Sequence, residues 1–108
     1  MIYADKFDDG DEPQTASEVF LHAARYIERF GYCKAMGKRG GPRSVFGAIT
    51  NTLATEASTM RFAHECGVIM RDMLGMDAQS WGVLHCGSRE QAIDVLVAAA
   101  YWTVKKNT

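Results

Sequence analysis

The sequence predicts an all-α fold, a compact bundle of about four helices over residues 15–108, preceded by an acidic N-terminal arm over residues 1–14. Apolar residues recur at helical spacing in three long segments of the chain. Two of these segments begin with patterns typical of helix starts, Thr15-Ala-Ser-Glu18 and Ser88-Arg-Glu-Gln91. One segment with the pattern of a short strand, Trp81-Gly-Val-Leu-His85, has no second strand to pair with.

Length and composition indicate one ordinary globular domain. The chain has 108 residues, 47% apolar and 23% charged, with a net charge of −1, so the molecule as a whole is not an obvious polyanion binder. No apolar run approaches the roughly 20 residues that span a bilayer, and the acidic N-terminus lacks the order of a secretory signal. We therefore expect a cytoplasmic protein that does not enter membranes and keeps its three cysteines reduced.

The first 14 residues read as an arm, because Asp8-Asp-Gly-Asp-Glu-Pro13 cannot bury apolar surface. A helix then follows from Thr15 to Phe30, with Gly31 as its stop. Residues 37–42, rich in glycine and ending in proline, predict a loop.

Ser44 is a candidate cap for a second helix that reaches Leu53, with an extended segment as the alternative. Residues 55–58 suit either a loop or the first turn of a third helix, which runs from Thr59 to Leu74. Gly67 inside that helix suggests a close approach by another helix.

Residues 76–87 are expected to be a connection, and a last helix starts after Ser88. Its apolar residues lie almost all round, which is typical of a helix at the centre of a core. We expect it to pack against the helix that starts at Thr15 and the helix around Cys66.

Basic residues are concentrated between the first two helices, among glycines. A glycine-rich loop can hold an anion, but Gly37-Lys-Arg-Gly-Gly-Pro-Arg43 has neither the Walker nor the Rossmann spacing. The candidate contacts for an anionic or protein partner are the basic residues of 25–43, together with Tyr32 among them and Trp81 in the predicted connection. The candidates are Arg25, Arg29, Lys34, Lys38, Arg39, Arg43, Tyr32 and Trp81.

Metal and cysteine chemistry receive little support from spacing. His22, His64 and His85 do not combine with the cysteines at the spacings that zinc sites use, so no metal or other cofactor is expected. Cys33 follows a helix end, beside Lys34. Cys86 precedes a helix start, and the helix dipole at that position would lower a thiol pKa. A cysteine-dependent enzyme therefore stays open as an alternative.

Three segments, Ala23-Ala-Arg-Tyr-Ile-Glu-Arg-Phe-Gly-Tyr-Cys33, Arg43-Ser-Val-Phe-Gly-Ala-Ile49 and the Ala-rich helix after Ser88, resemble a family of small uncharacterised proteins from actinobacteria and their phages. Ser44 stands where a second cysteine of that family would fall, and Trp81-Gly-Val-Leu-His-Cys86 replaces a Trp-Asn-Asp segment. The resemblance implies a bacterial cytoplasm, that of the host for a phage protein, and carries no established activity.

The expected function is a non-enzymatic module that binds an unknown protein partner; for a phage-encoded chain, it would modulate a host protein. Nucleic-acid binding through residues 25–43 is the first alternative, and a cysteine-dependent enzyme is the second. A homodimer is a further expectation, because an apolar last helix leaves surface uncovered in so small a domain.

Overall fold

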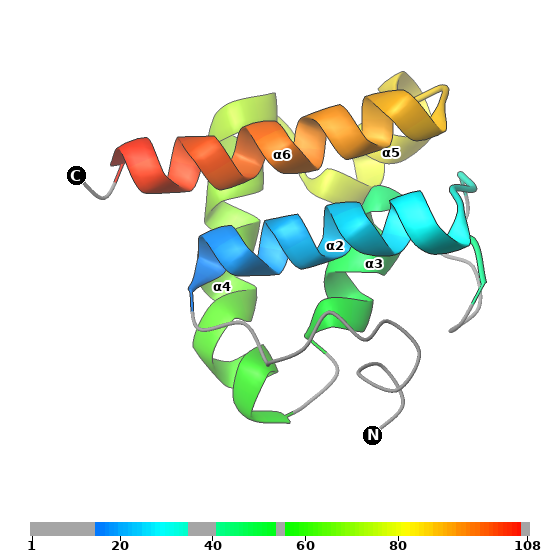
Figure 1. Cartoon of the computed structure of the whole chain (residues 1–108). Helices are drawn as coiled ribbons and strands as arrows, with labels where there is room; N and C mark the ends of the chain where they lie inside the picture. The colour runs from blue at the N-terminus through cyan, green and yellow to red at the C-terminus, as the bar shows by residue number, and fades with distance from the viewer. Residues whose placement is uncertain (1–14, 35–40, 54–55, 107–108) are drawn as a thin grey trace.

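The computed structural model describes residues 15–34, 41–53 and 56–106, and these form five helices (Figure 1). The helices are α2 (Ala16–Phe30), α3 (Val45–Thr52), α4 (Glu56–Leu74), α5 (Ala78–His85) and α6 (Arg89–Lys106). The all-helical prediction is confirmed, with one helix more than expected. The predicted acidic arm, residues 1–14, lies outside the described residues. None of the described helices combines the length and apolarity needed to cross a bilayer.

Helices α2 and α6 lie side by side in one layer, and α3, α4 and α5 pack behind them (Figure 1). The pair runs antiparallel, because side chains join opposite ends. The Ser17 hydroxyl donates to the Ala100 carbonyl at 3.1 Å, and Arg89 donates to the Glu28 carbonyl at 3.0 Å. The predicted packing of the first helix against the last is therefore confirmed, as is contact between α4 and α6.

The predicted helix starts have the expected caps. The Thr15 hydroxyl accepts from the Glu18 amide at 3.1 Å, and Ser44 accepts from the Gly47 amide at 3.0 Å, so α3 is a helix rather than an extended segment. Ser88 accepts from the Gln91 amide at 3.1 Å. Because α4 begins at Glu56, residues 56–58 belong to its first turn.

Residues 78–85 form α5, so the prediction of an irregular connection or short strand there is wrong. The Asp77 carboxylate accepts from the Ser80 amide at 3.1 Å and from its hydroxyl at 2.8 Å. These bonds satisfy free groups of the first turn and lower the pKa of Asp77. The Asp-x-x-Ser spacing was the signal in the sequence for this helix.

The centre of the core is α2 rather than α6, which corrects the prediction for the last helix. Helix α2 contacts α3, α4 and α6, and its Val19, Phe20 and Ile27 have no exposed surface. Helix α6 buries one face through residues such as Leu96. Its outer face exposes Tyr101, because the all-round apolar pattern exceeds what one side of a layer can cover.

Candidate functional site

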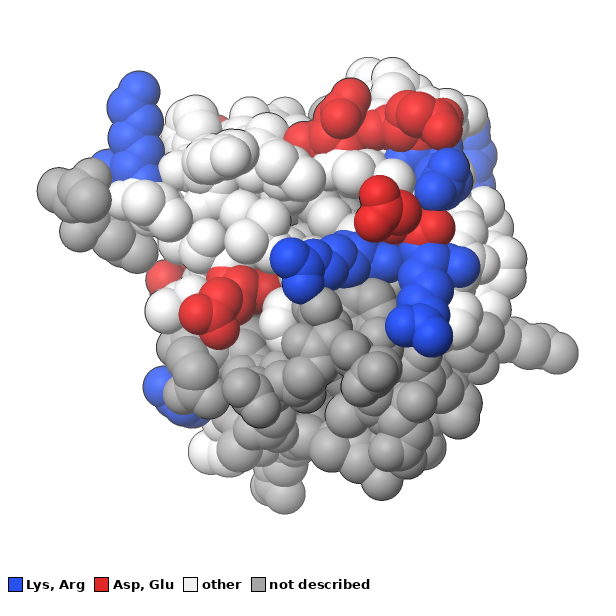
Figure 2. All heavy atoms as spheres, viewed as in Figure 1, with Lys and Arg blue, Asp and Glu red and all other residues white. Residues whose placement is uncertain are grey.

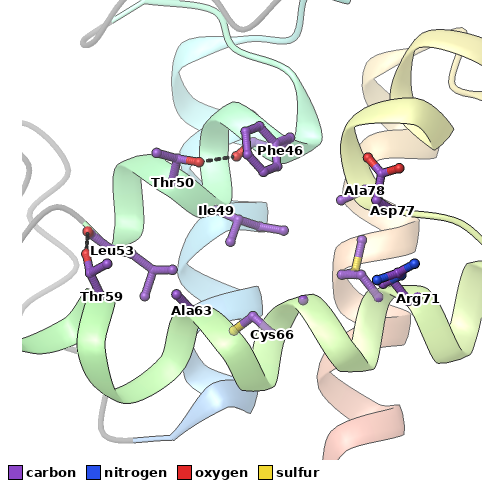
Figure 3. Close-up of a pocket in the computed structure, with 12 residues that line it drawn as sticks. Phe46, Ile49, Thr50, Leu53, Thr59, Ala63, Cys66, Arg71, Asp77 and Ala78 are labelled. Atoms are coloured by element: carbon purple, nitrogen blue, oxygen red, sulfur yellow. Dashed lines mark hydrogen bonds between the residues drawn. The ribbon is translucent and has the colours of Figure 1, made fainter.

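A pocket of about 310 Å³ opens between α3, α4 and α5 (Figure 3). Its volume lies at the lower end of the roughly 300–1,000 Å³ typical of ligand pockets. Most of the lining is apolar, with a few polar groups at its two ends. The lining residues are Phe46, Ile49, Thr50, Leu53, Thr59, Ala63, Cys66, Gly67, Met70, Arg71, Asp77 and Ala78.

The two long walls of the pocket follow from helical periodicity. On α3 and its C-cap residue Leu53, the apolar lining residues Phe46, Ile49 and Leu53 fall three and four residues apart, which places them on one face. On α4, Ala63 and Gly67 lie one turn apart on the facing wall. Small side chains at these two positions leave space that larger ones would fill. The pocket therefore exists because α4 has alanine and glycine there.

Polar groups at the pocket ends are used in different ways. The Thr50 hydroxyl donates to the Phe46 carbonyl at 2.9 Å, and the Thr59 hydroxyl donates to the Leu53 carbonyl at 2.6 Å (Figure 3). Both hydroxyls therefore donate their hydrogen to backbone carbonyls of the pocket walls rather than to a ligand. At the α5 end, the exposed Arg71 lies near Asp77, whose pKa it helps to lower after the larger effect of Ser80.

The Cys66 thiol lies midway along the α4 wall and is 2% exposed. Burial, with a smaller contribution from the neighbouring Glu65 carboxylate, raises the pKa of Cys66 from 9.0 to about 12. A thiol with that pKa stays protonated at neutral pH, and the thiolate is the nucleophilic form. In the pocket, Cys66 is therefore a small apolar lining group.

Gly67 is not a point of close helix approach, so that prediction is wrong. A Cβ built at this position has no heavy atom within 4 Å, because the glycine faces the pocket.

Replacing Gly67 with alanine should raise the free energy of unfolding by about 1 kcal/mol, since alanine loses less backbone entropy in a helix and nothing obstructs its methyl group. Urea unfolding followed by circular dichroism measures the change. Gly75→Ala is the matched control at the end of the same helix. Its φ of +77° is strained for alanine, so that variant should be less stable than wild type. A destabilised Gly67→Ala would show that the space is filled.

Arg43, one of the predicted contact residues, belongs to the interior. It is 6% exposed, and its Nη1 donates to Oδ1 of the buried Asn51 at 3.1 Å. Its amide donates to the Gly31 carbonyl at 3.3 Å, and its carbonyl accepts from the Cys33 amide at 3.2 Å. The arginine therefore fixes the start of α3 to the end of α2 rather than facing a partner.

The two predicted aromatic contacts also support the fold. Tyr32 is half-buried, and its hydroxyl donates to the Cys86 carbonyl at 3.0 Å, which joins the end of α2 to the end of α5. Burial, then the neighbouring Cys86 and Cys33, raises the pKa of Tyr32. Trp81 is partly buried against the core. Neither residue lines the pocket.

The remaining predicted cations divide into two groups. Arg25, Arg29 and Lys34 are exposed, whereas Lys38 and Arg39 lie outside the described residues. On the face formed by α2 and α6, basic side chains are mixed with acidic ones (Figure 2). One such pair is Arg89 and Glu90, whose charged atoms lie 3.6 Å apart. Where the chain is described, this face does not carry charge of one sign.

The other two cysteines donate to backbone carbonyls near the bonds that join α2, α3 and α5. The Cys33 thiol donates to the Pro42 carbonyl at 3.2 Å, and the Cys86 thiol, 1% exposed, donates to the Ser88 carbonyl at 3.5 Å. A substrate cannot reach the Cys86 sulfur without local opening. Among the described residues, no three His, Cys, Asp or Glu side chains gather where they could hold a metal ion.

Sequence reasoning missed the pocket, whose lining contains none of the six predicted contact residues that lie in the described part of the chain. The available signals were the small residues at positions 63 and 67 of an otherwise apolar helical face. Comparison with family models, with curated proteins and with solved structures finds no match to this chain.

Proposed function

We propose that this chain is a non-enzymatic protein-binding module whose α3–α4–α5 pocket receives a large apolar side chain of a partner. The observation that carries the proposal is the pocket itself, with apolar walls from two helices and Arg71 and Asp77 at one end. Binding energy in protein interfaces is concentrated in large side chains that enter such desolvated pockets. The surrounding polar surface would then form the rim of the interface.

The pocket chemistry suggests which partner segment it receives. Its apolar walls call for an aromatic or branched aliphatic side chain, since burying apolar surface yields roughly 25 cal/mol per Å². At the α5 end, Asp77 already accepts two hydrogen bonds from Ser80, while the Arg71 guanidinium is exposed at the same rim. We therefore propose that an acidic residue of the partner, next to its apolar anchor, pairs with Arg71.

Filling the pocket tests this function. The phenyl ring of Gly67→Phe would occupy the hollow, whereas Val68→Phe adds the same ring to an exposed neighbouring position that does not line it. The family resemblance directs the search to an actinobacterial lysate. A stoichiometric partner should be captured by wild type and Val68→Phe and lost with Gly67→Phe. Equal capture by all three proteins would refute the pocket as the binding site.

The polar part of the proposal has its own test. Arg71→Glu should weaken capture of the same partner, while Arg61→Glu, an exposed change on α4 outside the pocket, should not. The fluorescent probe 8-anilinonaphthalene-1-sulfonate gives a readout without a partner. Its fluorescence should rise with wild type and with Val68→Phe, and rise less with Gly67→Phe.

Nucleic-acid binding keeps one supporting observation, the exposed Arg25 and Arg29 one turn apart on α2. Phosphate contacts through them would make affinity fall steeply with salt. Titration of a labelled oligonucleotide at low and moderate salt with wild type and Arg25→Glu/Arg29→Glu tests this alternative. Absence of binding at low salt eliminates it.

A further inference from the structure

We infer that the outer face of α6 is a self-complementary surface through which two copies of this chain associate with their α6 helices antiparallel. The pocket is not part of this surface, so the inference is independent of the function proposed above. The face consists of residues that fall within about a 100° arc of the helix, at spacings of three and four. They are Glu90, Asp94, Val97, Ala98, Tyr101 and Lys105.

The middle of this face is apolar and exposed. Tyr101 is 73% exposed and Ala98 is exposed, while Val97 is partly buried against the core. Trp102 and Val104 extend the apolar surface on either side and are 42% and 52% exposed. Single exposed apolar residues are ordinary, but a cluster on one helix is typical of an interface.

Charge is distributed unevenly along the same helix. Acidic side chains gather over its N-terminal half and a basic side chain extends at its C-terminal end, with uncharged surface between them (Figure 2). Glu90 and Asp94 are the exposed acidic residues of this face, and Lys105 is the exposed basic one. The exposed Arg89 lies beside Glu90, with their charged atoms 3.6 Å apart, but its position on the helix falls outside this arc. The face within the arc is therefore acidic at one end and basic at the other, which makes it complementary to a reversed copy of itself.

The residue spacing fits an antiparallel pair with a two-fold axis between Val97 and Ala98. In that register Glu90 faces Lys105 of the second copy, Asp94 faces Tyr101, and the two central residues face each other. The span from Glu90 to Lys105 is about 22 Å at 1.5 Å per residue. The small Ala98 allows the two helices to approach at the axis, and each contact occurs twice, as two-fold symmetry requires.

The same residues argue against a parallel pair and for a second copy as the partner. A parallel arrangement would place Glu90 beside Glu90 and Lys105 beside Lys105, and like charges in contact oppose association. Because one helix pair buries less area than a standard stable interface, the dimer should be weak, with dissociation constants of about 10 µM to 1 mM.

Charge exchange tests both the dimer and its orientation. Sedimentation equilibrium of the whole chain at low ionic strength should show a monomer–dimer equilibrium for wild type. Glu90→Lys and Lys105→Glu alone should each raise the dissociation constant about threefold to tenfold. The double variant Glu90→Lys/Lys105→Glu should return it to near the wild-type value. Glu65→Lys, an exposed charge reversal on α4, is the control and should change it little.

A change at the axis gives a second, larger readout. Ala98→Glu would place two carboxylates at the centre of the interface and should abolish the dimer. Since Ala98 is exposed, the variant should keep the wild-type circular dichroism spectrum. A wild-type protein that is monomeric at millimolar concentration overturns the inference. So does a dimer that Ala98→Glu leaves intact, and failure of the double variant to restore association overturns the antiparallel register.

Discussion

Replacing Arg43 with alanine is expected to lower the free energy of unfolding by about 3 kcal/mol, the effect of an interior residue rather than a surface cation. The variant loses a buried, charge-assisted hydrogen bond to Asn51 Oδ1 at 3.1 Å and the packing of the arginine stem. It also leaves that oxygen, on a residue 1% exposed, without this donor. Urea unfolding followed by circular dichroism measures the change.

Arg29→Ala is the matched control, since Arg29 is exposed on α2 and substitutions at such positions usually stay within about 0.5 kcal/mol. Asn51→Leu should also destabilise, because Arg43 would lose its neutral acceptor inside the protein. The loss in the double variant should be smaller than the sum of the two single losses, since the residues share a bond. Equal, small effects of Arg43→Ala and Arg29→Ala would contradict the assignment.

Arg43 shows why the predicted basic surface was only partly correct. In the sequence it resembles the other cations of residues 25–43, because charge patterns carry no information on burial. In the fold, its backbone pairs with Gly31 and Cys33 at the end of α2, and its side chain bonds to the buried Asn51. The predicted cations that stay exposed on α2 are Arg25 and Arg29. On the face formed by α2 and α6, basic side chains are mixed with acidic ones (Figure 2).

Local signals predicted the helices well, because caps and periodicity act within a few residues. Thr15, Ser44 and Ser88 accept from the amides three residues later, as their positions suggested. Gly31 ends α2 with a φ of +101°, a backbone conformation that residues with a Cβ rarely adopt. Helix α5 differs from the prediction because residues 81–85 have a strand-like pattern on their own, whereas the Asp77 cap that starts the helix lies before them.

Properties set by packing between helices were not available from the sequence. The pocket arises where α3, α4 and α5 meet, and no local pattern states which small residue faces a neighbour and which faces a hollow. Gly67 suited both outcomes. Likewise, the apolar pattern of α6 suggested a central helix, but the layer places α2 between more neighbours and leaves Tyr101 outside.

The alkaline stability of the protein should depend on Cys66. Its pKa is about 12 in the folded chain against 9.0 as the ordinary value, so folding favours the protonated thiol. Below pH 9 the thiol is protonated in both the folded and the unfolded chain, so Cys66 does not make the free energy of unfolding depend on pH there. Between pH 9 and pH 12 the unfolded chain releases the proton while the folded chain retains it. Unfolding therefore becomes easier as pH rises, by about 1.4 kcal/mol per pH unit.

Between pH 8 and pH 11, the free energy of unfolding of wild type should therefore fall by about 2–3 kcal/mol because of Cys66. This value holds for a thiol that stays protonated in the folded chain over that range. Cys66→Ala removes this loss. It should be somewhat less stable than wild type at pH 8, because a buried sulfur is replaced by a smaller group, and should equal or exceed wild type at pH 11.

Urea unfolding of both proteins at pH 8 and pH 11 measures the difference. Tyr32, whose pKa is also raised, titrates in both proteins, so its contribution cancels in the comparison. Lysine deprotonation cancels for the same reason. Parallel pH dependences of the two proteins would mean that the Cys66 thiol reaches water in the folded state. Water would then occupy the pocket as far as Cys66, and an apolar side chain of a partner would have to displace that water to bind.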